Sequence, residues 1–288
     1  MRGTILGAVI AVVAMVVLVS PAAGRQSPSV AALQVALHSR SVYAGSIDGV
    51  SGTQTVAALR TFQRRAGLAP TGIVNQRTRR ALGALGGPLA GRRTMGVGSF
   101  GWDVSVLEFE LARHGFAPGK IDGRFDLATL AAVERFRRFA GLPYHCLVEP
   151  SLLATLKNVK EPRPRVSLDR PVHGRIVRRY GIRGNHLHAG LDFAAPYGLG
   201  VAAAADGRVV YADEGPRGLG LMVRIVHRHG VESVYGHLSR IDVKVGERVV
   251  RGAWLGLVGR TGNAVKPNLY FEVRVRGAAI DPLAALAP

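Results

Sequence analysis

The spacing of apolar residues divides the chain into two parts that predict different secondary structure. Between residues 30 and 156, leucine, valine and phenylalanine recur at intervals of three or four, which is typical of one apolar helix face. From Pro171 onward this periodicity gives way to short β-rich runs between Gly, Pro and Asp turns. These runs are 208–211, 221–226, 231–235 and 270–275. The pattern predicts all-α units followed by an antiparallel all-β domain.

An internal repeat organises the helical part. A shift of 74 residues aligns Leu33 with Leu107, Phe62 with Phe136, and Ile47-Asp48-Gly49 with Ile121-Asp122-Gly123, without a gap. A repeat of about 60 residues plus spacer is too long for a solenoid unit. We therefore predict two small tandem units of three helices each, and we expect the first to fold by itself around its own core.

Local signals set the predicted boundaries of helices and units. Pro28 is placed to start the first helix, and Thr53 and Asn75 are placed to cap the second and third. The chain is divided as follows: a signal peptide at 1–24, a first helical unit at 25–90, a second at 96–158, a linker at 159–167 and a β domain at 168–288. Residues 86–100 are rich in glycine and predict a flexible connection.

The first 24 residues predict export from the cytoplasm. Arg2 precedes an apolar run from Ile5 to Ser20, and Ala22-Ala23-Gly24 offers a small-residue cleavage site. The run is shorter than the roughly 20 residues that a spanning helix needs, although an uncleaved anchor remains an alternative. Export places the rest of the chain outside the cytoplasm, as a secreted or cell-wall associated protein.

Composition narrows the partners of an exported chain. The formal net charge is +19, which favours polyanionic partners. Export and the lack of an aromatic-plus-basic cluster argue against nucleic acid, so anionic wall polymers or anionic lipid headgroups are the better candidates, with a solvated basic surface as the alternative. The single cysteine, Cys146, excludes an internal disulfide framework and is expected to be a small buried side chain.

One short stretch suggests metal chemistry. His188 and Asp192 lie four residues apart with Gly190 between them, and Zn²⁺ accepts both imidazole nitrogen and carboxylate oxygen. Since no amphipathic helix surrounds the pair, it would have to reach an ion from a strand end or loop, where glycine lets the backbone bend. An exposed polar turn is the alternative reading of this pair alone.

Further motifs downstream give this pair a context. They are Tyr235-Gly236-His237-Leu238, Gly259-Arg260-Thr261-Gly262 and Asn268-Leu269-Tyr270-Phe271-Glu272. In this order and with similar separations, they make residues 167–286 resemble the lysostaphin- or LytM-type zinc metallopeptidases of bacterial cell walls. The resemblance implies an antiparallel β fold, zinc ligation by His188 and Asp192, and a catalytic role for His237.

The family pattern is broken at two positions. Where the family has His-Leu-His, this chain has Asn268-Leu269-Tyr270. Asn268 stands at the position of the other catalytic histidine, and Tyr270 stands at the position of the third zinc ligand. Three replacements for the missing ligand are conceivable: Tyr270 as a phenolate, His186 from the same strand face as His188, and the pair His227 and His229, which are expected at the surface. The change predicts weak or absent zinc.

The helical units also resemble a known family, the peptidoglycan-binding-like domains. Leu33-Gln34, Ile47-Asp48-Gly49 and Phe62-Gln63 match that pattern in the first unit. The resemblance implies peptidoglycan binding through Asp48, Gly49, Phe62 and Gln63, with a spacer role as the alternative. The second unit departs from the pattern at Glu108, Arg137 and Asp126, which favours a mainly structural role.

Two hypotheses of function follow. In the first, the chain binds peptidoglycan and its peptidase-like domain is a catalytically impaired binding or regulatory module, with a wall-hydrolase partner. In the second, it is an active zinc endopeptidase that hydrolyses peptidoglycan peptide bonds with an unconventional third ligand.

Overall fold

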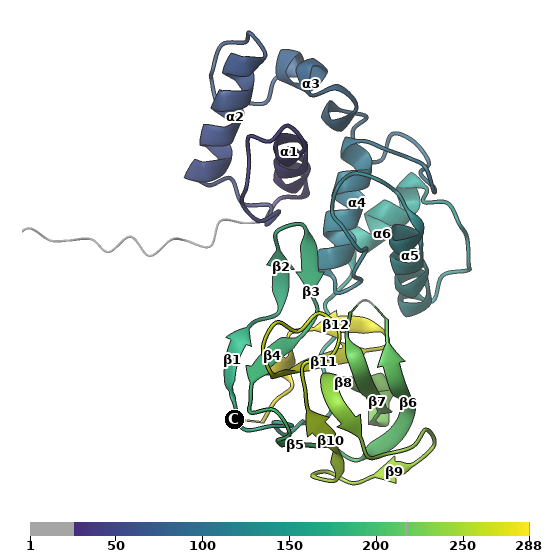
Figure 1. Cartoon of the computed structure of the whole chain (residues 1–288). Coiled ribbons are helices and arrows are strands. Elements are labelled where there is room, and N and C mark those ends of the chain that lie inside the picture. Colours follow the sequence, from purple (N-terminus) through teal and green to yellow (C-terminus); the bar gives the residue numbers. More distant parts are fainter. Residues whose placement is uncertain (1–25, 217, 288) are drawn as a thin grey trace, which may run out of the picture.

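The computed structural model describes residues 26–216 and 218–287 (Figure 1). The signal peptide predicted at 1–24 lies outside these residues. Among the described helices, none combines the length and apolar character needed to cross a bilayer. The helical units occupy one end of the molecule and the β domain the other, as the sequence pattern predicted.

The described α-helices form two sets of three. The first set is α1 (Pro28–Ser39), α2 (Thr53–Arg65) and α3 (Gln76–Leu82), and the second is α4 (Trp102–Arg113), α5 (Leu127–Ala140) and α6 (Pro150–Asn158). A short 3₁₀ turn, η1 (Gly83–Gly86), follows α3. Corresponding helices in the two sets begin 74 residues apart, which is the shift found in the sequence. The prediction of two tandem three-helix units is confirmed.

The helix starts agree with the local sequence signals except at α2. Pro28 occupies the first turn of α1, and the Asn75 side chain caps α3 by accepting a hydrogen bond from the Thr78 backbone N–H at 2.9 Å. The cap predicted at Thr53 is wrong by one residue, because Gly52 is the N-cap and Thr53 is the first helical residue.

The two helical units share one hydrophobic core, which we call the helical core. Helix α1 packs against α4, so it is buried on faces that point toward both units. The ring of Phe109 on α4 lies so close to Gly49 of the first unit that a side chain there would collide with it. An isolated first unit would expose the α4-facing side of α1, so the structure argues against the expectation that it folds alone.

The segment between the units is packed rather than flexible. Met95 is buried and pairs with Val148 in an isolated β-bridge, while the Arg93 guanidinium forms an ion pair with Asp103 at 2.7 Å. The prediction of a flexible connection at 86–100 is therefore wrong, since its side chains have partners in the second unit. Cys146 also differs from the expectation, because it is exposed instead of buried.

The β domain is built on one antiparallel sheet whose strands run in the order β1-β4-β11-β8-β7-β6-β9. Strand β12 extends it beside β11, and β10 pairs with both β8 and β5. The bounds are β1 (Arg175–Arg178), β4 (Leu191–Ala194), β5 (Gly200–Ala202), β6 (Gly207–Gly215), β7 (Gly220–Val226), β8 (Val231–Ile241), β9 (Arg248–Val249), β10 (Trp254–Val258), β11 (Asn268–Val275) and β12 (Ala278–Ile280). Two short 3₁₀ turns are η2 (Arg228–Gly230) and η3 (Pro282–Ala284). The four predicted β runs lie in β6, β7, β8 and β11, and the antiparallel all-β class is confirmed.

A hairpin joins the β domain to both helical units. It consists of β2 (Gly181–Arg183) and β3 (His186–His188), and it projects toward α1 and α4 in Figure 1. At its tip, Gly184 O accepts a hydrogen bond from Ile47 N, and Asn185 O accepts one from Ile121 N, both at 2.7 Å. These two donors are equivalent in the repeat, so the hairpin is held by the same turn of each unit.

Candidate functional site

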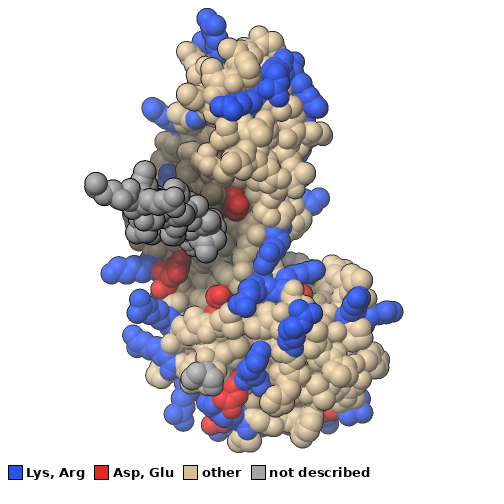
Figure 2. Space-filling view, turned by 90° about the vertical axis from the view of Figure 1, so that its left-hand side faces the viewer, with Lys and Arg blue, Asp and Glu red and all other residues tan. Residues whose placement is uncertain are grey.

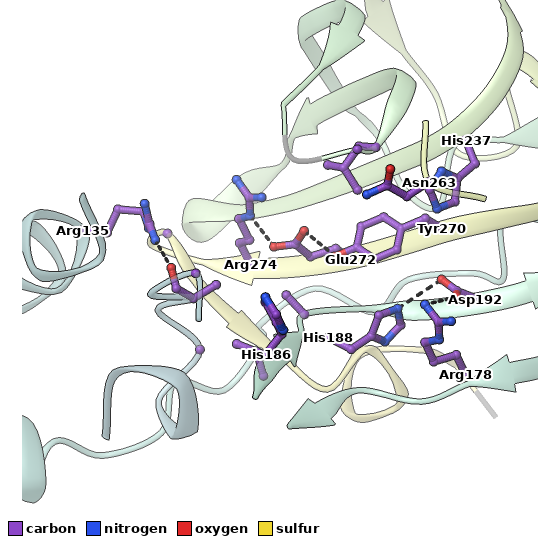
Figure 3. A pocket seen from close by; sticks show the side chains of 18 residues that line it. Arg135, Arg178, His186, His188, Asp192, His237, Asn263, Tyr270, Glu272 and Arg274 are labelled. Carbon is purple, nitrogen blue, oxygen red and sulfur yellow. Dashed lines mark hydrogen bonds and ion pairs between the residues drawn. The ribbon is translucent and has the colours of Figure 1, made fainter. Parts of the chain in front are cut away.

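The strand pairing gathers the residues of the broken family pattern. Asp192 on β4 and Gly236 on β8 face Tyr270 from the two strands that flank β11. His188 ends the neighbouring hairpin strand β3, and His237 follows Gly236 on β8. His188, Asp192, His237 and Tyr270 line one pocket, which Figure 3 shows from close by. The sequence motifs thus meet in space as the resemblance implied.

His188 and Asp192 are oriented as a pair of metal ligands would be. The Nε2 atom of His188 lies 3.2 Å from Asp192 Oδ1, and its Nδ1 atom lies 3.1 Å from the backbone oxygen of Arg179. A carbonyl can only accept, so Nδ1 is the donor in that bond, and Nε2 is the nitrogen directed at Asp192 and the site. Asp192 also forms an ion pair with Arg178 at 3.5 Å, but the Arg178 side chain is largely exposed, so the pair adds little stability.

Gly190 allows this geometry through close approach of the backbone. A Cβ atom at this position would collide with the backbone oxygen of Phe271 on β11, and it would press on the Tyr270 ring. Only glycine fits at position 190, because the backbone there lies directly against strand β11 beside the site. The sequence assigned it a role in bending, and the structure supplies this more specific reason.

Tyr270 fills the space between the two histidines. Its ring makes edge contacts with His188 and His237, at centroid distances of 5.6 and 5.9 Å. Its hydroxyl donates a hydrogen bond to Glu272 Oε2 at 2.9 Å. Burial and the neighbouring Glu272 carboxylate hold the pKa of Tyr270 well above its ordinary value. A phenolate ligand at this position is therefore disfavoured.

His237 keeps the orientation of a catalytic imidazole. Its Nδ1 atom lies 2.9 Å from the backbone oxygen of Thr261, so Nδ1 is the donor and Nε2 faces the pocket. Burial lowers the pKa of His237, so the ring is neutral at neutral pH. The Thr261 hydroxyl donates to Leu238 O at 2.7 Å and accepts from Leu221 N at 3.0 Å. The Gly-Arg-Thr-Gly motif therefore positions His237, because Thr261 holds the Nδ1 side of the ring and leaves Nε2 toward the pocket.

Asn268 lies beside the site without lining the pocket. Its amide nitrogen donates to the backbone oxygen of Lys266 at 2.7 Å, and its Oδ1 atom is buried without a hydrogen-bond partner. An amide at this position cannot accept a proton near neutral pH as an imidazole can. His237 is therefore left without the second catalytic group that the family pattern provides.

The donor set does not fit a catalytic zinc ion. Such a site needs three protein ligands and one open position for water. His188 and Asp192 supply two donors, while the third position holds a protonated phenol that is committed to Glu272. Among the described residues, no group of three His, Cys, Asp or Glu side chains is arranged to hold a metal ion.

The other histidines do not supply the missing ligand. His186 lines the same pocket as His188 but lies away from Asp192. Burial of its ring and the positive charge of Lys120 both lower the pKa of His186. His229 lies in the turn η2 and is exposed, as expected. The prediction that His227 lies at the surface is wrong, because its side chain is buried and hydrogen-bonded to Asp206 O and Ser233 Oγ.

Two residues at the site were not assigned their roles from sequence. Arg178 lies in an arginine-rich run that carries no motif, so nothing in the sequence placed it against Asp192. Glu272 belongs to a recognised motif, but its bonds to Tyr270 and to Arg274, at 2.9 and 2.6 Å, depend on strand β11. The alternation of Tyr270, Glu272 and Arg274 was the available signal, since alternate strand residues share a face.

The residues predicted to bind peptidoglycan lie at the first unit, and most of them are buried. Gln63 is fully buried and holds the loop after α2, accepting from Gly72 N and donating to Ile73 O at 2.9 Å each. Phe62 is in the helical core, and Gly49 lies under Phe109. Asp48 is half-buried and accepts from Gln34 Nε2 at 2.7 Å. Contacts of these four residues with peptidoglycan stay a prediction.

Comparisons with known proteins agree with both resemblances. The model of peptidase family M23 matches residues 186–282, and a peptidoglycan binding domain model matches residues 26–82 and 101–145. The chain therefore carries a LytM-type domain of peptidase family M23, preceded by two peptidoglycan-binding-type helical units.

Two proteins with similar sequences are named for different roles, one as an activator of murein hydrolases and one as an enzyme. The murein hydrolase activator EnvC of Escherichia coli is 38% identical over 136 residues, which are 46% of this chain and 32% of that protein. The DD-carboxypeptidase/endopeptidase Mpg of Neisseria meningitidis is 37% identical over 123 residues, or 41% of this chain and 28% of that one. The match thus spans about a third or less of these relatives.

A solved structure with a similar domain is the catalytic domain of lysostaphin from Staphylococcus simulans. It is 31% identical, with a TM-score of 0.36, and the match covers 38% of this chain and 90% of that one.

Proposed function

We propose that this chain is an extracytoplasmic wall protein that binds peptidoglycan through its helical units and uses its LytM-type domain as a non-catalytic binding or regulatory module. The observation that carries the proposal is the Tyr270 side chain. It stands at the third ligand position between His188 and His237, keeps its proton, and donates a hydrogen bond to Glu272. Chemistry at this site is limited to hydrogen bonding and charge.

Peptidoglycan or a wall-hydrolase partner is the proposed ligand class. The match to peptidoglycan-binding units supports attachment to the wall, and the resemblance to a protein named murein hydrolase activator supports a regulatory role. The first unit is strongly basic, so anionic wall polymers can add affinity that falls with salt. Figure 2 shows the arginine side chains of that unit in blue, at the top of the view.

Zinc content and wall hydrolysis test the proposal together. We expect purified protein to hold well below one zinc per chain by atomic absorption, and to leave a peptidoglycan suspension turbid. Asn268→His with Tyr270→His restores the family's three donors and second imidazole, and should gain both zinc and hydrolysis. Rebuilt activity in this double variant would show that the other site residues are intact.

The competing hypothesis is an active zinc endopeptidase with an unconventional ligand. It is favoured by the intact orientation of His188, Asp192 and His237. Stoichiometric zinc in the natural chain, together with hydrolysis that His188→Ala abolishes, would establish it and overturn the non-catalytic proposal.

A further inference from the structure

Helices α2 and α3 of the first unit carry positive charge that no carboxylate balances. They contain no acidic residue, and their basic residues are Arg60, Arg64 and Arg65 on α2 and Arg77, Arg79 and Arg80 on α3. The one carboxylate of this unit, Asp48, is half-buried and accepts from Gln34 Nε2 and Val50 N. Within the described residues, no ion pair includes an arginine of α2 or α3.

The internal repeat shows that the fold does not require these arginines. At the equivalent positions of the second unit, Arg60 is replaced by Glu134, Arg77 by Ser151 and Arg80 by Ala154. The second unit forms the equivalent helices α5 and α6 with these residues. Arg77 also lies in the first turn of α3, where a positive charge opposes the helix dipole. The charge on the first unit therefore serves a purpose other than helix formation.

The loop between α2 and α3 presents an apolar side chain next to this charge. Residues 66–76 are uncharged, and Ile73 is 68% exposed. The buried Gln63 side chain fixes the loop, because it donates to Ile73 O and accepts from Gly72 N, both at 2.9 Å. A Cβ atom on Gly72 would press on the Arg60 side chain, so the loop lies against α2. Ile73 is thus held at the surface by its own backbone bonds.

The equivalent residue of the second unit is better covered. Leu147 corresponds to Ile73, and its side chain lies so close to Gly96 that a Cβ atom there would collide with it. Its exposed fraction is 40%. The first unit therefore differs from the second in two ways at the same place, by added positive charge and by a more exposed apolar side chain.

We infer that α2, α3 and the loop between them dock on an anionic phospholipid bilayer. We call the residues that make this contact the distal surface: Arg60, Arg64, Ile73, Arg77 and Arg80, all of which are exposed. Guanidinium groups pair with lipid phosphates through planar hydrogen bonds. An apolar side chain among them gains further by entering the boundary between headgroups and acyl chains. A hydrated phosphate polymer offers only the first of these two interactions.

The place of the distal surface in the molecule agrees with this partner. Helices α2 and α3 lie at the end of the molecule opposite the β domain (Figure 1). A chain docked by this end would hold its LytM-type domain away from the bilayer. The inference goes beyond the proposed function, which gives the charge of the first unit to wall polymers, and it holds whether or not the β domain is catalytic.

Flotation with lipid vesicles tests the inference. The protein is residues 25–288, the exported chain without its predicted signal peptide, because the apolar run at 5–20 would itself bind lipid. Vesicles of phosphatidylcholine with about 30% phosphatidylglycerol are compared with vesicles of phosphatidylcholine alone. We expect binding to the anionic vesicles only, and we expect it to weaken as salt is added.

Variants of the distal surface separate its two contributions. Arg60→Gln with Arg64→Gln should weaken binding about thirtyfold, because each arginine near an anionic surface contributes a factor of about five. Ile73→Ser should weaken it about tenfold, because apolar area is then no longer removed from water.

Matched controls change the same chemistry elsewhere. Arg163→Gln with Arg165→Gln removes two exposed arginines from the linker, and Val245→Ser removes a 65% exposed apolar side chain from the β domain. Both should bind vesicles like the natural chain, and thermal unfolding shows that each variant is folded. Equal weakening by the linker pair would show a general attraction of charge and would overturn the inference.

A soluble glycerol phosphate polymer separates a bilayer from a wall polymer. We expect the polymer to bind more weakly than the vesicles and to be insensitive to Ile73→Ser. If vesicle binding is also insensitive to Ile73→Ser in a folded variant, the distal surface serves a phosphate polymer, and the bilayer inference is wrong. Equal binding to neutral vesicles, binding to neither kind of vesicle, or full binding by the folded Arg60 and Arg64 double variant would likewise overturn it.

Discussion

The two helical units share an apolar skeleton, yet their charges and surroundings differ. Residues 26–90 contain seven arginines and one acidic residue, Asp48, which gives a formal charge of +6. Residues 96–158 contain seven basic and seven acidic residues and are formally neutral. The first unit contacts the β domain chiefly through the hairpin tip, whereas the second also contacts β12 and lines the pocket.

Arg137 in the second unit keeps the role of the glutamine at the equivalent position of the first unit. Gln63 and Arg137 are equivalent in the repeat, and both hold the loop that follows their helix. Arg137 reaches further, donating to Leu147 O at 2.8 Å and to Glu149 at 3.0 Å. Arg137 therefore has a structural role, and it lies in the unit that is docked on the β domain.

The largest expected effect comes from breaking the contact between the units. Phe109→Ala removes a fully buried ring from the helical core, which should lower the free energy of unfolding by about 3–5 kcal/mol. Because α1 and α4 share that core, hydrogen exchange should quicken in both helical units at once. Phe193→Ala, in the separate core of the β domain, is the control. Faster exchange in the second unit alone would show that the units are independent.

A smaller effect is expected from exchanging the polar residue at the centre of each unit. Gln34 donates to Asp48 Oδ1 at 2.7 Å, whereas its counterpart Glu108 accepts from Asp122 N and Gly123 N at 3.0 and 2.8 Å. Burial, reinforced by nearby carboxylates, raises the pKa of Glu108 well above its ordinary range. The protonated side chain thus resembles glutamine.

This difference predicts a pH dependence of stability. The folded state holds the Glu108 proton more tightly than the unfolded chain, so its contribution is complete below about pH 4.5 and is lost as pH rises through the folded pKa. Glu108→Gln should raise the free energy of unfolding by on the order of 1–3 kcal/mol at pH values above the folded pKa of Glu108. Below about pH 4.5 it should leave the free energy of unfolding unchanged. Gln34→Glu should do the reverse. Urea unfolding at pH 4 and pH 8 measures both, and parallel curves for Glu108→Gln and the natural chain would contradict the assignment.

Much of the fold followed from local patterns, because helices and long strands carry their own periodicity. The repeat placed the six described helices, and β6, β7, β8 and β11 were found from their β-rich runs. The strands β1, β2, β4, β5, β9, β10 and β12 have two to five residues and were missed. Such strands exist only because a longer neighbour pairs with them, which no local pattern records.

The site was predictable in its members but not in its arrangement. Ordered motifs named His188, Asp192, His237 and the broken position at Tyr270. The hydrogen bond from Tyr270 to Glu272 depends on the extended conformation of β11, and the pocket wall around Arg135 depends on docking of the second unit. The contact between Gly115 and Ala279 beside that wall joins residues more than a hundred positions apart, so local sequence could not supply it.

The smallest effect concerns the third departure of the second unit from the family pattern. Asp126 caps α5 by accepting a hydrogen bond from Thr129 N at 2.9 Å, whereas the equivalent Gly52 caps α2 without a side-chain bond. Asp126→Gly should destabilise the chain by only about a few tenths of a kcal/mol, since glycine is itself an acceptable N-cap. Gly52→Asp should gain a similar amount and give α2 the cap that α5 has.

The measurement is the midpoint of thermal unfolding, and sacculus binding of both variants is compared with that of the natural chain. If Asp126 is only a helix cap, binding stays constant while the midpoint moves. A loss of sacculus binding in Asp126→Gly, with the midpoint almost unchanged, would instead assign this carboxylate to the wall-binding surface of the second unit.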